Sequence, residues 1–149
     1  MPHLTVGAIH HLRLAVSDVA RSTAFYTEVL GFTVAVEGPP PPENEHHEAL
    51  VDSLQDGVIL MHEGIFIGLR PVDDERASAA DRFDPFRVGL DHLSFSVPTR
   101  ADLDAASRIL DERGIDHGPI RELAPLGLSF LAFFDPDGIA LELTAPIAD

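Results

Sequence analysis

The sequence predicts an α+β fold in which two tandem βαβββ modules form a curved, barrel-like sheet around a cup. Two observations lead to this prediction. The segments 11–16 (HLRLAV) and 92–97 (HLSFSV) share their apolar spacing and both begin with histidine. Each precedes a helical pattern that ends at a glycine and is followed by three further strand patterns. The 149 residues are enough for one compact domain built from this repeat.

We place the two modules within a single domain that covers residues 1–149. Module one is expected at about residues 6–72 and module two at about residues 89–146. The polar segment between them, about residues 73–88, is predicted to be a linker.

The first module opens with an alternating strand over residues 9–16. Ser17 or Asp18 supplies a helix N-cap, and apolar residues recur at helical spacing over residues 19–30. Gly31 is expected to stop this helix.

Three strands complete the first module. One is predicted over residues 32–36, and a hairpin joins residues 58–61 to residues 65–69. Residues 38–48 (GPPPPENEHHE) contain four consecutive prolines, which fit neither a helix nor a central strand. We expect a loop here, either simply solvated or acting as a lid over the cup.

The second module repeats the order. A strand over residues 91–97 is followed by Thr99, with Asp102 three residues later in a capping-box position. The helix continues through residues 103–113 and ends at Gly114.

The remaining strands of module two are predicted over residues 115–120, 128–134 and 139–144. The last two are joined by residues 135–138 (DPDG), in which proline sets the second φ and glycine takes the positive φ.

The repeat places potential metal ligands on one face. In each first strand the alternate apolar residues face the helix, so His11 and His92 lie on the opposite, concave face. In the last strand Leu141 and Leu143 face the helix, which directs Glu142 into the concavity. If the two curved sheets pair, two imidazoles and one carboxylate converge on one cup. Such a set leaves open positions on a metal, as a catalytic site requires.

Each of these histidines, taken singly, could instead be an ordinary polar residue of a strand. A carboxylate inside an apolar strand, as at Glu142, needs a cation or hydrogen-bond donors to offset its burial. The coincidence of the three positions favours a metal site.

Three further polar residues are expected on the concave face, because side chains alternate between the two faces along a strand. Arg13 and Arg70 are expected either to bind a carboxylate or phosphate of a substrate or to pair with acidic neighbours. Ser94 is predicted to contact substrate beside them.

Composition excludes several classes of protein. The chain has no cysteine, so disulfides, thiolate metal sites and cysteine nucleophiles are excluded. A formal net charge of −15 disfavours nucleic acids and anionic membranes as partners. With no long apolar run and no signal-peptide pattern, we expect a cytoplasmic protein.

The segments HHLRLAVSDVARSTAFYTEVLGF, GLDHLSFSV and FFDPDGIALEL resemble the vicinal oxygen chelate superfamily. This superfamily includes glyoxalase I, fosfomycin-resistance enzymes, methylmalonyl-CoA epimerase, extradiol dioxygenases and bleomycin-resistance proteins. The resemblance implies that His11, His92 and Glu142 hold one divalent metal ion (Fe, Mn, Ni, Co or Zn). Under this resemblance, Glu142 is expected to act as a catalytic residue as well as a metal ligand. At the position of a fourth ligand the chain has Gly68, which departs from the glyoxalase I pattern.

The resemblance implies a metal-dependent enzyme that performs glyoxalase-like lyase, isomerase or transferase chemistry on a small oxygen-bearing substrate, within a homodimer. One alternative is a metal-free, bleomycin-resistance-like protein that sequesters a ligand. A further alternative is an extradiol-type dioxygenase. Ring cleavage is disfavoured because Ala132 stands about where the dioxygenase signature has tyrosine.

Overall fold

The computed structural model describes residue 4 and residues 6–73 and 82–147. The chain divides into two compact units, Met1–Asp81 and Arg82–Asp149, called unit one and unit two below. Each unit contains one four-stranded mixed sheet that is not closed into a barrel, and the fold is α+β as predicted. Most of the predicted linker, residues 74–81, lies outside the described residues.

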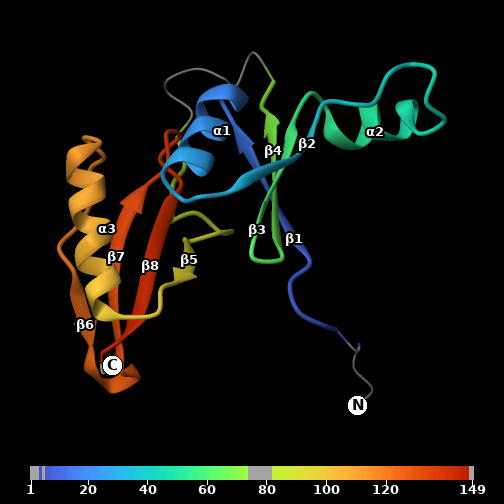
Figure 1. Ribbon diagram of the computed structural model, residues 1–149. Coiled ribbons are helices and arrows are strands. Elements are labelled where there is room, and N and C mark those ends of the chain that lie inside the picture. The colour runs from blue at the N-terminus through green and yellow to red at the C-terminus, as the bar shows by residue number, and fades with distance from the viewer. Residues whose placement is uncertain (1–3, 5, 74–81, 148–149) are drawn as a thin grey trace. The chain divides into compact units, whose positions relative to one another are not determined.

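Unit one follows the predicted order, with one additional helix between its second and third strands (Figure 1). Its elements are β1 (His11–Val16), α1 (Val19–Glu28), β2 (Thr33–Glu37), α2 (His47–Leu54), β3 (Val58–His62) and β4 (Ile65–Pro71). The strand order in the sheet is β1-β4-β3-β2. Strands β1 and β4 are parallel, whereas the β2–β3 and β3–β4 pairs are antiparallel.

Unit two repeats this topology (Figure 1). Its elements are β5 (Leu93–Ser96), α3 (Arg100–Glu112), β6 (Arg121–Leu123), the 3₁₀ turn η1 (Ala124–Leu126), β7 (Leu128–Phe134) and β8 (Ala140–Pro146). The strand order is β5-β8-β7-β6, with β5 parallel to β8. The internal repeat predicted from the sequence is therefore a repeat of sheet topology.

Both long helices begin at side-chain caps. Asp18 Oδ1 accepts a hydrogen bond from the Arg21 N–H at 3.0 Å, which identifies Asp18 rather than Ser17 as the N-cap of α1. At α3 the predicted capping box is present, because Thr99 and Asp102 each bond the other's backbone N–H. The caps start each helix immediately after the first strand of its unit.

Helices α1 and α3 each cover one face of the sheet in their own unit. Helix α1 contacts β2, β3 and β4, and helix α3 contacts β7 and β8. The alternate apolar residues of the strands fill the layer between helix and sheet, as do Tyr26 and Leu103 from the helices. This arrangement directs the other face of each strand, which carries His11 in β1, away from α1 and α3.

The structure departs from three local predictions. The loop over residues 38–48 ends in helix α2, which begins at His47 and was not expected. The strand expected over residues 115–120 is reduced to a single bridge between His117 and Phe133, and β6 forms later, at Arg121–Leu123. In addition, His92 lies one residue before β5 rather than within it.

The turn between β7 and β8 has the predicted chemistry. Gly138 has a φ of +82° and donates its N–H to the Asp135 carbonyl at 3.0 Å. The Asp135 carboxylate accepts hydrogen bonds from the N–H groups of Asp137 and Ile139 at 2.9 and 2.8 Å. This turn sets the register that aligns β8 with its neighbours.

Within the described parts of the chain, none of the helices has both the length and the apolar character needed to cross a membrane.

Candidate metal and substrate site

The strand registers define which residues of the two units are equivalent. In unit one, Arg13 on β1 lies opposite Gly68 on β4. In unit two, Ser94 on β5 lies opposite Glu142 on β8. Because the sheets share one topology, Arg13 corresponds to Ser94 and Gly68 to Glu142. His11 and His92 stand two residues before these positions in their units.

In unit two, His92 and Glu142 face each other. The His92 Nε2 and the Glu142 Oε1 are 3.9 Å apart. The other ring nitrogen of His92, Nδ1, lies 2.5 Å from the Asp91 Oδ1, which orients the imidazole. The Glu142 side chain is 20% exposed and that of His92 is 44% exposed, so both reach solvent-accessible space.

Two hydroxyls surround the Glu142 carboxylate. Ser94 Oγ is 3.0 Å and Thr144 Oγ1 is 2.9 Å from Glu142 Oε1, and the two hydroxyl oxygens are 2.6 Å apart. Each hydroxyl has one hydrogen, so two of these three contacts are hydrogen bonds at any moment. Ser94, predicted to contact substrate, therefore lies where it positions the carboxylate.

A cavity of about 280 Å³ opens beside these residues. Its described lining contains the acidic pair Asp91 and Glu142 together with His92, and it contains no arginine. Ala132, which lies opposite Glu142 in the β7–β8 register, also lines it. The wall therefore offers no phenol at the position where the dioxygenase pattern has tyrosine.

In unit one, His11 has a different neighbour. The Nδ1 atoms of His10 and His11 are 2.9 Å apart, so one imidazole donates to the other. The His10 ring stacks on Phe66 with 6.2 Å between ring centroids. Like His92, His11 thus has its Nδ1 engaged by the preceding residue.

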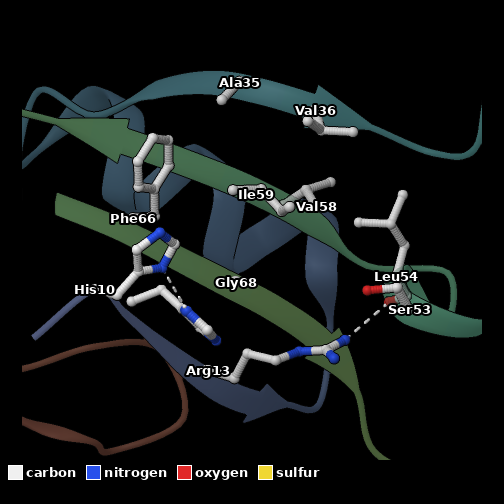
Figure 2. Close-up of a pocket in the computed structure, with 11 residues that line it drawn as sticks. His10, Arg13, Ala35, Val36, Ser53, Leu54, Val58, Ile59, Phe66 and Gly68 are labelled. Carbon is white, nitrogen blue, oxygen red and sulfur yellow. Dashed lines mark hydrogen bonds between the residues drawn. The ribbon is translucent and has the colours of Figure 1, made fainter. Parts of the chain in front are cut away.

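Arg13 lies across the glycine that corresponds to Glu142 (Figure 2). A Cβ atom added at Gly68 would be 2.9 Å from the Arg13 Cγ, which shows how closely the stem crosses the strand. The guanidinium Nη2 donates to the Leu54 carbonyl at 3.2 Å. Arg13 and Gly68 line a cavity of about 460 Å³ within unit one.

Arg70 is placed differently from Arg13. It lies opposite Ala15 in the β1–β4 register and is half-buried, but it does not line the cavity of unit one.

The three predicted ligands are thus divided between the units. His92 and Glu142 lie together in unit two, whereas His11 lies in unit one. Among the described residues, no group of three or more His, Cys, Asp or Glu side chains forms a cluster that could hold a metal ion.

Two orienting residues were missed from the sequence. Asp91 and His10 each directly precede a candidate ligand, so the dipeptides Asp91-His92 and His10-His11 were the available signal. Adjacent residues of an ideal strand point apart, so strand alternation alone would place His10 on the face opposite His11. His10 lies just before β1 begins, where this alternation does not hold.

The sequence matches the model of the Glyoxalase/Bleomycin resistance protein/Dioxygenase superfamily over residues 8–143. The chain belongs to this superfamily. It is also 35% identical over 140 residues to the uncharacterized protein YwkD of Bacillus subtilis (strain 168), covering 94% of this chain and 98% of that protein.

Solved structures agree with this membership. A glyoxylase/bleomycin resistance protein/dioxygenase domain from Frankia sp. EAN1pec superposes with a TM-score of 0.72 at 32% identity, covering 95% of this chain and 93% of that one. The fosfomycin resistance protein FosX from Listeria monocytogenes has a TM-score of 0.68 at 17% identity, covering 95% and 94%. The second similarity shows a shared fold.

Proposed function

We propose that this protein is a metal-dependent enzyme of the superfamily that acts on a small oxygen-bearing molecule. His11, His92 and Glu142 would hold one divalent metal ion, with Glu142 as the ligand that carries negative charge. The observation that carries the proposal is the pair of facing donor atoms, His92 Nε2 and Glu142 Oε1, 3.9 Å apart in one cavity wall.

Two ligand atoms about 2.1 Å from one metal stand roughly 3.0–3.4 Å apart at octahedral or tetrahedral angles. The separation of 3.9 Å between His92 Nε2 and Glu142 Oε1 is therefore within about 1 Å of that of two ligands of one ion. Imidazole nitrogen and carboxylate oxygen are donors that Mn, Fe, Co, Ni and Zn all accept. When bound, the metal would polarise substrate oxygens and stabilise negative charge that develops on them.

The neighbouring residues have positioning roles in this proposal. Asp91 holds the His92 Nδ1 and so presents Nε2 to the site. Ser94 and Thr144 donate to the Glu142 carboxylate, which fixes its orientation and lowers the cost of its partial burial. His10 performs for His11 the role that Asp91 performs for His92.

The third ligand is supported by the repeat. His11 occupies in unit one the position of His92 in unit two, two residues before the registered pair. Gly68 supplies no side chain where unit two has Glu142, so the proposed set is two histidines and one carboxylate. Such a set leaves coordination positions for substrate.

We further propose a single domain with modules at about residues 6–72 and 89–146, acting as a homodimer in the cytoplasm. Besides a second copy of the chain, its partner would be a small-molecule substrate or ligand.

Elemental analysis tests the metal site. Protein purified without chelator or histidine tag is expected to carry about one transition metal ion per chain. Glu142→Gln should weaken the binding at least about 100-fold, since loss of a ligand costs more than the 10–100-fold typical of its outer partners. His46→Asn, an exposed loop substitution, is the control that should retain the metal.

Retention of stoichiometric metal by Glu142→Gln would contradict the ligand assignment. A wild-type protein that takes up none of the candidate ions would favour a metal-free binding protein that sequesters its ligand. Bound iron would direct assays toward extradiol-type dioxygenase activity.

A further inference from the structure

The cavity of unit one contains an arginine in a mostly apolar setting. Its described lining includes Val36, Val58, Ile59 and Phe66, and it contains no aspartate or glutamate. His10 and His11 both line the cavity. In Figure 2, His10 lies at the end of the cavity formed by Phe66, and Arg13 extends toward Leu54. The cavity thus combines an apolar wall with a fixed cation.

The charge of the chain makes this arginine unusual. The protein has 25 acidic and 10 basic residues, and every basic residue is an arginine. Carboxylates are therefore abundant partners for arginine. Yet among the described residues Arg13 forms no ion pair, and its recorded hydrogen bond is to the neutral carbonyl of Leu54.

The register explains how Arg13 reaches this place. The position opposite it is Gly68, so the aliphatic stem crosses the strand where any side chain would collide with its Cγ. The stem fills this space and one Nη2 hydrogen is bonded to Leu54. A guanidinium has five N–H donors in a planar fork, so most of them remain for a ligand.

We propose that the cavity of unit one binds an oxyanion, such as a carboxylate or phosphonate, carried on a compact apolar body. The Arg13 fork would bind the oxyanion in a bidentate manner, and Val36, Ile59 and Phe66 would contact the apolar body. The identification of this ligand as the substrate rests on the proposed function. The oxyanion would then lie at the end of the substrate that is farther from His11. His11 stands two residues before Arg13 on β1.

Benzoate is a suitable probe, with benzamide as its uncharged counterpart of similar shape. Binding to the full chain is followed by calorimetry and by the NMR resonances of the Arg13 Nε–H and the Gly68 amide. Benzoate is expected to shift both resonances and to bind at least tenfold more tightly than benzamide.

Arg13→Met retains most of the aliphatic stem over Gly68 and removes the guanidinium group. It should weaken benzoate binding at least tenfold, and Arg13→Lys should restore part of the affinity because it keeps the charge without the planar geometry. Arg108→Met is the matched control. It removes the same charge from an exposed position on α3 that lines neither cavity, and benzoate affinity should stay within twofold.

Three results would overturn the proposal: undetectable benzoate binding, equal affinity for benzamide, or undiminished benzoate affinity in Arg13→Met. The metal content of Arg13→Met separates this proposal from the proposed function, and it should equal that of the wild type. If the wild-type protein binds benzoate through Arg13 but takes up no metal, the anion site is supported and the assignment as a metal-dependent enzyme is contradicted.

Discussion

The two units share one topology but differ at the pair of residues that face each other across the parallel strands. Unit two has Ser94 opposite Glu142, and the hydroxyl donates to the carboxylate. Unit one has Arg13 opposite Gly68, and the arginine stem occupies the space above the glycine. A duplicated fold thus provides an acidic cavity in one copy and a cationic cavity in the other. Two of the differences lie at these registered positions, and Asp91 in place of His10 adds a second acidic residue to the cavity of unit two.

A second pair of equivalent residues has the same identity in both units but different surroundings. A glycine directly precedes the third strand of each unit, Gly57 before β3 and Gly127 before β7. A Cβ at Gly57 would lie 2.0 Å from the Leu69 carbonyl oxygen. Gly127 has open space around its Cβ position but a φ of +67°.

The largest expected effect is on stability at these glycines. Gly57→Ala forces backbone apart and should lower the free energy of unfolding by about 3 kcal/mol or more. Gly127→Ala strains only φ and should cost about 1 kcal/mol. Urea denaturation of both variants measures the difference. Equal losses would show that the close approach at Gly57 relaxes freely.

The next effect concerns the residues that orient the two histidines. Asp91→Asn keeps the size of the His92 partner and removes its charge, so metal affinity should fall about 10–100-fold. His10→Asn replaces the imidazole partner of His11 by a carboxamide that can also form a hydrogen bond, and it should change affinity less than about tenfold. Competition against a metallochromic chelator measures both. A larger loss for His10→Asn would reverse the proposed ranking.

The smallest expected effect sharpens the comparison directly. The double variant Arg13→Ser/Gly68→Glu gives unit one the residues of unit two and should increase metal affinity by about tenfold, because a second carboxylate joins the proposed set. Gly68→Glu alone serves as the control, since its side chain meets the Arg13 stem and pairs with the guanidinium. The same chelator competition measures both variants. An unchanged affinity in the double variant would argue against His11 as a ligand.

The sequence alone determined the features that depend on local patterning. Alternating apolar residues predicted the strands that bury their leucines, and side-chain caps predicted the starts of both long helices. The Asp135–Gly138 turn followed from the φ preferences of proline and glycine. Because the repeat shows in the apolar spacing, the amino-acid pattern was also sufficient to predict the duplication. The superfamily was indicated by the resemblance of three segments to a known family.

Tertiary structure decided what depends on neighbours that are distant in sequence. Helix α2 formed beside a proline run whose local signals indicated a loop, and its Leu54 packs into the core. The register alone showed that Arg13 lies over Gly68 and that Ser94 contacts Glu142, because parity gives the face of a strand but not the partner opposite. His10 bonds His11 because it stands outside the regular strand, where the alternation of side chains no longer applies.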